Sequence, residues 1–225
     1  MTAVLSKYRL STNRPLLFYS LEDIPSWTVR IALSLWSIKY DGRELHGEEM
    51  AGLEYGRVVS SGDTPCLYRS KRSTVGCDAV MEWVLKQRKE IDGVERIRPE
   101  GWAVCESVNR AAAVLGACSP KPRLGILGSE KYGIKNNDEA LARWNNRDME
   151  ELDRILEKYS NKYCIGDHIS MPDFYLYPRV RVSQTHFSHQ IDKLPYISKV
   201  FSNLKTISAF ENSEPEINHI LHIKG

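Results

Sequence analysis

The order of apolar patterns in the first ninety residues constrains the fold more than any other feature of the sequence. Strand patterns and helical patterns alternate there, because apolar residues recur first in short continuous runs and then at helical spacing. The predicted order is strand 15–20, helix from Ser26, strand 40–46, short helix 48–55, hairpin 63–75 with its turn at Lys71–Arg72, and helix 78–89. This order suits a small mixed sheet with helices on its faces.

The pattern changes after Gly101, beyond which no strand is predicted. Helical patterns cover 102–118 and 141–159, and further helices begin at Ser170 and Pro195. A polar stretch with Gly93 and Pro99 separates the two halves and is interpreted as a linker. The expected fold class is therefore α/β plus all-α, with domains at 14–91 and 101–225 joined by a linker at 92–100.

Composition excludes several classes of protein. Apolar residues make up 42% of the 225 residues and charged residues 27%, which is ordinary for a globular chain. The net charge is only +2, without the basic excess of a nucleic-acid binder. No apolar run approaches 18 residues, and the first residues lack the apolar core of a signal peptide. We therefore expect a cytoplasmic protein with neither nucleic-acid nor membrane partners.

The cysteines indicate reduced thiols and no metal site. Five cysteines are scattered along the chain without a CxxC pair, which argues against a disulfide framework or a structural zinc site. His219 and His222 form an H-x-x-H pair near the C-terminus, but no third ligand stands near them in the sequence. We therefore predict no metal.

Thr64 and Pro65 precede a predicted strand and form the first candidate site. Proline cannot donate to a sheet ladder, so it belongs at an edge or at the start of a strand. If the Thr64–Pro65 peptide is cis, it presents the backbone of Thr64 outward, where a peptide ligand can pair with it. The alternative is a strand that merely begins with proline.

Residues 75–78 lie between a strand and a helix and form the second candidate site. Free N–H groups at a helix N-terminus bind anions such as carboxylates, which points to Gly76, Cys77 and Asp78. Asp78 acting as a simple helix cap is the alternative. Cys77 near that terminus is also a candidate for a lowered thiol pKa.

Residues 20–26 precede the first helix and form the third candidate site. Hydroxyl and N–H groups there suit the stabilisation of a thiolate or another anion, whereas Asp23 would oppose this if it pointed inward. A solvated loop with Ser26 as helix cap is the alternative. Farther along, Ser170 and Asp173 have the spacing of a capping box, which we interpret as folding chemistry and not catalysis.

Four segments together resemble the cytosolic glutathione transferases, and among them the zeta class, the maleylacetoacetate isomerase family. YCIGDHISMPDFYLYPRV is similar to the family's GD-x-x-[ST]-x-A-D helix start, with Pro172 in place of alanine. SWTVRIALSL, TPCL and AVMEW resemble the family's first helix, its cis-proline strand and the helix after its [EQ]-S motif. The resemblance covers about 14–214.

This resemblance implies a thioredoxin-like N-terminal domain, an all-helical glutathione transferase C-terminal domain, and usually a homodimer. It implies glutathione as cofactor, with Thr64 before Pro65 pairing with the cysteinyl backbone. The family's [EQ]-S pair, which receives the γ-glutamyl carboxylate, falls on Gly76 and Cys77, so both side chains are missing. Backbone N–H groups of Cys77 and Asp78 are expected to hold the carboxylate instead.

The sequence departs from the family most sharply at the catalytic position. The serine thought to support the thiolate falls on Asp23, where a carboxylate would raise a nearby thiol pKa. Either Asp23 turns outward or a nearby group substitutes. The candidates for that group are Ser26, Tyr19 and Ser20, in this order of preference.

Three hypotheses for function follow from the resemblance and from these departures. The first is glutathione-dependent cis–trans isomerisation of a conjugated olefin in a small-molecule substrate, by reversible thiolate addition. The substitutions argue against the family's ordinary di-acid substrate and resemble fungal transferases of secondary metabolism, which implies a larger, neutral polyketide-type molecule. The second is conjugation of glutathione to an electrophile, and the third is a non-catalytic binding or assembly module.

Overall fold

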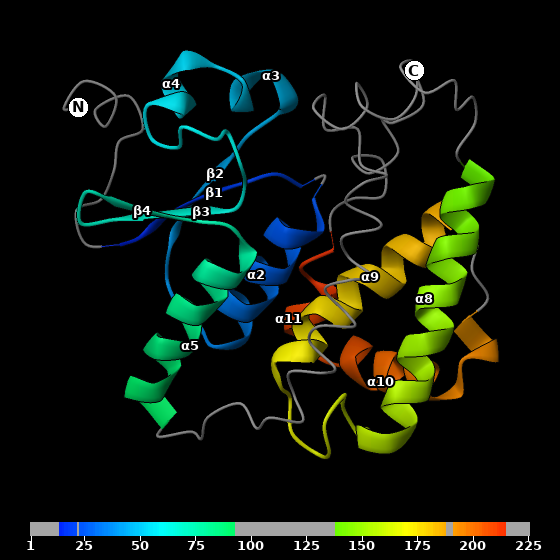
Figure 1. Cartoon of the computed structure of the whole chain (residues 1–225). Helices are drawn as coiled ribbons and strands as arrows, with labels where there is room; N and C mark the ends of the chain where they lie inside the picture. The colour runs from blue at the N-terminus through cyan, green and yellow to red at the C-terminus, as the bar shows by residue number, and fades with distance from the viewer. Residues whose placement is uncertain (1–13, 22, 93–137, 188–190, 215–225) are drawn as a thin grey trace. The chain divides into compact units, whose positions relative to one another are not determined.

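The computed structural model describes residues 14–21, 23–92, 138–187 and 191–214 and divides into two units, 1–95 and 96–225 (Figure 1). The division falls between Glu95 and Arg96, within the stretch predicted as a linker. The helix predicted at 102–118 and the histidine pair near the C-terminus lie outside the described residues.

Unit 1 contains a four-stranded sheet in the order β2-β1-β3-β4. Its strands are β1 (Leu16–Tyr19), β2 (Asp41–Glu44), β3 (Cys66–Arg69) and β4 (Arg72–Val75). β1 pairs with β2 in parallel and with β3 in antiparallel orientation, and β3 pairs antiparallel with β4. The mixed sheet predicted from the sequence is confirmed.

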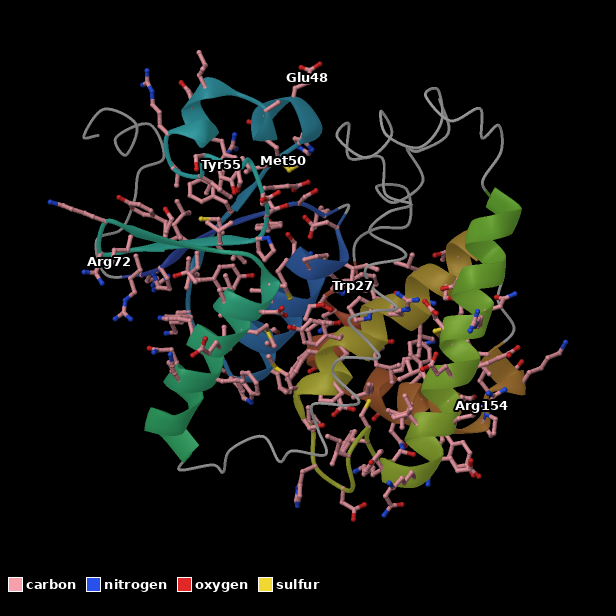
Figure 2. The ribbon with its side chains drawn as sticks, in the orientation of Figure 1. Trp27, Glu48, Met50, Tyr55, Arg72 and Arg154 are labelled. Atoms are coloured by element: carbon pink, nitrogen blue, oxygen red, sulfur yellow. The ribbon has the colours of Figure 1, made fainter. Side chains whose placement is uncertain are left out.

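Helices cover both faces of this sheet. They are α2 (Ile24–Leu35), α3 (Gly47–Met50), α4 (Leu53–Gly56) and α5 (Cys77–Asp92). α2 and α5 contact each other on one face, and α3 and α4 lie on the other (Figure 1). Side chains alternate along β1, so that Leu16 and Phe18 join Tyr55 in one buried cluster while Leu17 faces the opposite side. Tyr55 and Met50 lie between the short helices and the sheet (Figure 2).

Two local predictions in unit 1 need correction. The single helix expected at 48–55 is two short helices, because Gly52 has extended backbone and begins α4 as its N-cap. The turn of the β3–β4 hairpin is Ser70–Lys71 and not Lys71–Arg72, since Arg69 pairs with Arg72. Both turn residues have positive φ, 50° and 64°, as a two-residue hairpin turn of type I′ requires.

The regular elements of unit 2 that the structure describes are helices, and the loop 160–170 contains an isolated parallel bridge between Ser160 and Gly166. Its elements are α8 (Asp138–Tyr159), α9 (Met171–Phe187), the 3₁₀ turn η1 (Ile191–Lys193), α10 (Pro195–Lys205) and α11 (Ser208–Glu211). Phe174 and Tyr177 of α9 stack on Phe210 and Phe201 with ring centroids 5.7 and 5.1 Å apart. No helix of the described residues is both long and apolar enough to cross a membrane.

One half of the predicted capping box at the start of α9 is present, because the Asp173 carboxylate accepts the Ser170 N–H, whereas the Asp173 N–H donates to the Ser170 carbonyl at 3.1 Å and not to its hydroxyl. Ser170 donates to the Asp173 carboxylate from its backbone N–H at 2.7 Å and from its hydroxyl at 2.9 Å. The other carboxylate oxygen accepts the Cys164 N–H at 2.9 Å. Asp173 therefore joins the preceding loop to the helix.

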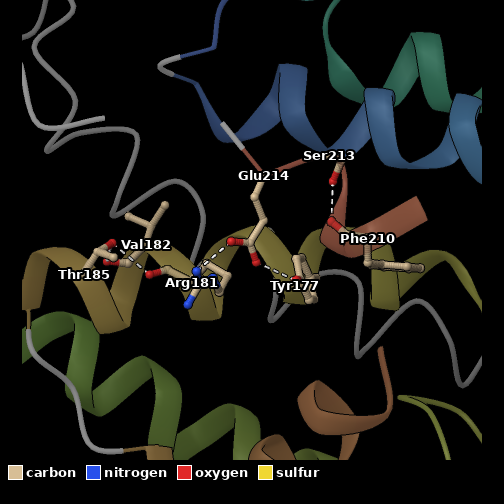
Figure 3. A network of polar contacts seen from close by, with 7 residues as sticks. All are labelled: Tyr177, Arg181, Val182, Thr185, Phe210, Ser213 and Glu214. Carbon is tan, nitrogen blue, oxygen red and sulfur yellow. Dashed lines mark hydrogen bonds and ion pairs between the residues drawn. The ribbon is translucent and has the colours of Figure 1, made fainter. Parts of the chain in front are cut away.

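The last described residues are held to α9 by a polar network around Glu214 (Figure 3). One carboxylate oxygen accepts from the Tyr177 hydroxyl and the other pairs with Arg181, each at 2.6 Å. Burial and the neighbouring Glu214 raise the pKa of the Tyr177 hydroxyl, so it stays a donor at neutral pH.

Candidate functional site

Three backbone segments of unit 1 converge beside the start of β3. They are the Thr64–Pro65 peptide, the N-terminus of α2 and the N-terminus of α5. Thr64 donates its hydroxyl to the Asp23 carboxylate, and Gly76 N–H donates to the Pro65 carbonyl at 2.9 Å. The Cys77 thiol lies 3.6 Å from the Pro25 carbonyl oxygen. The three candidate sites identified separately in the sequence therefore form one cluster.

The Thr64–Pro65 peptide is cis. The Thr64 hydroxyl donates to the Asp23 carboxylate, and its oxygen lies 3.8 Å from the Met50 sulfur. In the described part of the chain, no group forms a hydrogen bond with the main-chain N–H or C=O of Thr64. An added extended peptide pairs with main-chain groups of this kind.

Asp23 turns inward and caps α2. Its exposed fraction is 8%, one carboxylate oxygen accepts the Ser26 N–H, and the other accepts the Thr64 hydroxyl. The backbone carbonyl of Asp23 also accepts the Trp27 N–H at 3.2 Å. Of the two alternatives left open by the sequence, the structure therefore excludes an outward Asp23.

Ser26 and Ser20 are bonded to each other within the same cluster. Ser26 is fully buried, and its hydroxyl oxygen accepts the Ser20 N–H at 3.1 Å. This contact joins the end of β1 to the first turn of α2. The hydroxyl thus orders the loop, and its role in supporting a thiolate stays a prediction.

Tyr19 lies on the β2 side of β1. Its half-buried ring carries the Arg30 guanidinium 5.2 Å above its centroid, and a Cβ at Gly42 would lie 3.2 Å from the ring. Burial raises the pKa of the Tyr19 hydroxyl, and Arg30 partly offsets this. Tyr19 therefore contacts Arg30 and Gly42, whereas Ser26 contacts both Asp23 and Ser20.

The start of α5 offers a site for an anion. Gly76 has a φ of +93°, which favours glycine, and its carbonyl accepts the Val80 N–H at 3.1 Å. Cys77 and Asp78 therefore form the first turn, where helical N–H groups have no partner within the helix and attract negative charge. Asp78 is exposed and Cys77 is half-buried.

Tyr55 supports the site from α4, and sequence reasoning missed it. Its hydroxyl donates to the Asp63 carbonyl at 2.6 Å and so fixes the loop that leads into Thr64. Burial raises the pKa of this hydroxyl, as do Cys66, Asp63 and Asp23. Burial also raises the pKa of the Cys66 thiol to about 11, so that Cys66 stays a neutral core residue. No local pattern distinguishes Tyr55 from an ordinary core tyrosine.

Within the ranges that the structure describes, no three His, Cys, Asp or Glu side chains form a group suited to a metal ion. The site is made of backbone N–H and C=O groups and one buried carboxylate. Such a set of groups suits a peptide-like ligand with a carboxylate at one end.

Comparisons with known proteins show which proteins this chain is similar to. No family model matches the chain. The maleylacetoacetate isomerase of Mus musculus is 26% identical over 215 residues, which cover 92% of this chain and 94% of that protein.

Solved structures with the same fold include zeta-class proteins. A maleylacetoacetate isomerase from Anaeromyxobacter dehalogenans with GSH bound in its active site has a TM-score of 0.69 at 17% identity, covering 90% of this chain and 95% of that one. A maleyl pyruvate isomerase, a bacterial zeta-class glutathione S-transferase, has a TM-score of 0.67 at 21% identity, covering 88% and 95%. The resemblance to the zeta class and the expected fold class, a thioredoxin-like unit followed by a helical unit, are confirmed.

Proposed function

We propose that this chain, whose relatives are zeta-class glutathione transferases and maleylacetoacetate isomerases, is a glutathione-dependent enzyme that isomerises a conjugated olefin. The observation that supports it most is the convergence of the cis Thr64–Pro65 peptide with the N-termini of α2 and α5. The substrate is a small molecule, and glutathione is the cofactor. A cytoplasmic homodimer is part of the same proposal.

Glutathione fits the site as a short extended peptide. Its cysteinyl residue pairs with the main-chain N–H and C=O of Thr64, which bond to no other described group. Its γ-glutamyl carboxylate lies at the first turn of α5, where the N–H groups of Cys77 and Asp78 point. The Gly76 N–H bond to Pro65 fixes the distance between these two anchors.

The reaction is nucleophilic catalysis with the glutathione sulfur as nucleophile. The sulfur adds to one carbon of the activated double bond, and the π electrons move onto the conjugated carbonyl. The carbon–carbon bond is then single and rotates. Return of the electrons expels the sulfur, which restores the olefin in its trans form and regenerates glutathione.

The charge at the site favours an uncharged substrate. Asp23 is a buried carboxylate next to Thr64, and a second negative charge from a di-acid would be repelled. Residues 20–23, directly after β1, contain no arginine to bind such a charge. We therefore propose a neutral conjugated olefin, such as a polyketide-type molecule of secondary metabolism.

Two other functions remain as alternatives. Conjugation of glutathione to an electrophile uses the same addition step without elimination. A non-catalytic module is favoured by Asp23, Gly76 and Cys77, which stand where the family has its serine and its [EQ]-S pair.

The test uses dimethyl maleate, a neutral cis olefin, with reduced glutathione and the purified full chain. Isomerisation predicts dimethyl fumarate with glutathione unchanged, whereas conjugation predicts a product with the combined mass of both reactants. Maleate is the matched probe that carries charge. The protein should accelerate its reaction, over the rate without protein, less than it accelerates the reaction of dimethyl maleate. Rates equal to that background for both probes would contradict both enzyme functions and leave the binding module.

A further inference from the structure

Tyr55 holds both ends of the loop that leads into Thr64. Its main-chain carbonyl accepts the N–H groups of Val58 and Val59, each at 2.8 Å, and its hydroxyl donates to the Asp63 carbonyl at 2.6 Å. Its ring is 2% exposed and packs within the buried cluster between the short helices and the sheet (Figure 2). The hydroxyl is therefore a donor whose place is fixed by the packing of its own ring.

The Asp63 carbonyl and the Thr64 N–H belong to the same peptide group. A peptide group is planar, and in its trans form the C=O and N–H bonds point in opposite directions. Within the described ranges the cis peptide is Thr64–Pro65, so the Asp63–Thr64 peptide is trans. Because its carbonyl points toward the Tyr55 hydroxyl, the Thr64 N–H points away from the buried cluster. Tyr55 thus sets the direction of an N–H group that the proposed function assigns to glutathione.

The neighbouring contacts hold other atoms of this segment. The Thr64 hydroxyl donates to Asp23, and the Pro65 carbonyl accepts an N–H from the backbone directly before α5. Neither contact involves the Asp63–Thr64 peptide group. In the described part of the chain, the group that bonds to the Asp63 carbonyl is the Tyr55 hydroxyl. Loss of this hydroxyl therefore frees one peptide group, while the segment that follows it stays held.

The Tyr55 hydroxyl keeps its proton at neutral pH. Burial raises its pKa, and the neighbouring Cys66, Asp63 and Asp23 raise it further. The hydroxyl therefore remains a donor, and its bond to the Asp63 carbonyl does not depend on the ionisation of Tyr55 under ordinary assay conditions.

We infer that Tyr55 is a positioning residue for glutathione, because its hydroxyl holds the Thr64 N–H in the direction in which the cysteinyl residue pairs with it. The inference rests on the proposed function, since it requires glutathione on Thr64. Tyr55 acts through the main chain and not by touching the ligand. It therefore governs the affinity for glutathione.

The expected size of the effect follows from preorganisation of the peptide group. An ordinary hydrogen bond between neutral groups favours the bonded orientation by about two- to tenfold. Without this bond the binding orientation is populated only in part, and the apparent dissociation constant rises by the inverse of that fraction. Removal of the hydroxyl should therefore weaken glutathione binding about two- to tenfold.

The test compares Tyr55→Phe with the wild type by calorimetric titration of the full chain with reduced glutathione. The variant keeps the ring in the core and loses only the hydroxyl, so it should fold and show this weaker binding. Tyr177→Phe is the matched control, because it removes a hydroxyl whose bond to Glu214 in unit 2 is also 2.6 Å long. Urea denaturation should show a loss of stability in both variants, whereas the affinity for glutathione should fall in Tyr55→Phe alone.

A second readout follows the peptide group itself, in NMR spectra of the full chain labelled at its threonine nitrogens. A hydrogen bond to a carbonyl polarises the N–H of the same peptide group. Without ligand, Tyr55→Phe should therefore shift the Thr64 amide signal more than those of Thr185 and Thr206, which lie in unit 2.

The outcomes separate this inference from the proposed function. Equal glutathione affinity of Tyr55→Phe and wild type overturns the inference alone, as does an equal loss of affinity in Tyr177→Phe. An unchanged Thr64 amide signal in Tyr55→Phe also overturns it. Absence of glutathione binding by the folded wild type overturns the proposed function and the inference with it.

Discussion

Replacement of Asp173 by alanine tests whether one buried carboxylate holds the start of α9. The side chain is fully buried and accepts three hydrogen bonds, from the Cys164 N–H, the Ser170 N–H and the Ser170 hydroxyl. In the alanine variant the Cys164 and Ser170 N–H groups lose their acceptor. The helix also loses half of its capping box.

The expected loss of stability follows from these contacts. Leaving a buried N–H without a partner costs about 1–3 kcal/mol, and loss of a helix cap costs about 1 kcal/mol. The Cys164 N–H and the cap, which includes the Ser170 N–H, together predict that Asp173→Ala lowers the free energy of unfolding by about 2–4 kcal/mol. Ser170→Ala removes only the hydroxyl contact and should cost about 1 kcal/mol.

Urea denaturation followed by far-ultraviolet circular dichroism measures both variants. Asp173→Ala should shift the midpoint far more than Ser170→Ala does. A loss below about 1 kcal/mol for Asp173→Ala, or equal losses for the two variants, would refute the argument that this carboxylate joins the loop to the helix.

Three further predictions concern pH, the Glu214 network and the core. Burial raises the pKa of Asp173 above its value in the unfolded chain, although its hydrogen bonds lower it. The free energy of unfolding should therefore fall as pH rises from the ordinary aspartate pKa through the raised one. In urea titrations across acidic pH, Asp173→Asn should abolish this slope. Glu214→Ala removes the acceptor of Tyr177 and the partner of Arg181, so it should lower stability by about 1–3 kcal/mol in urea, and a loss no greater than that of Tyr177→Phe would contradict the network. Leu156→Ala empties a fully buried position on α8 and should cost about 2–5 kcal/mol in the same assay, whereas exposed Leu53→Ala should cost less than about 0.5 kcal/mol.

Local patterns predicted most elements of the fold. The helical spacing from Ser26, the apolar run of β1 and the contact of the Asp173 carboxylate with the Ser170 N–H each depend on residues a few positions apart, and each is present in the structure. η1 and α11 were not predicted, because three or four residues are too few to show a period. The division of 48–55 into two helices depends on the extended backbone of Gly52.

The candidate site was predictable in its parts but not in its contacts. The sequence identified Thr64, Asp23 and Ser26 as candidates, yet the first two are 41 positions apart, and no spacing indicates that their side chains bond. Ser26, the preferred hydroxyl, is bonded to the Ser20 N–H inside the loop. Tyr55 was missed because its role depends on reaching the Asp63 carbonyl after the chain has folded.

These contacts change the interpretation of the site. In the sequence, Asp23 is only a substitution at the family's serine position. In the structure it is a helix cap and the partner of Thr64. The parts of the proposed glutathione site therefore include a buried carboxylate at this position.

Calorimetric titration with reduced glutathione tests the central claim most directly. The account predicts a dissociation constant from micromolar to low millimolar, or about −8 to −4 kcal/mol of binding free energy. Cys77→Glu places a carboxylate where the γ-glutamyl carboxylate should bind and should weaken binding at least tenfold, whereas Cys77→Ser should not weaken it. No detectable binding by the folded wild type, or equal affinity in the Cys77→Glu variant, would contradict the account.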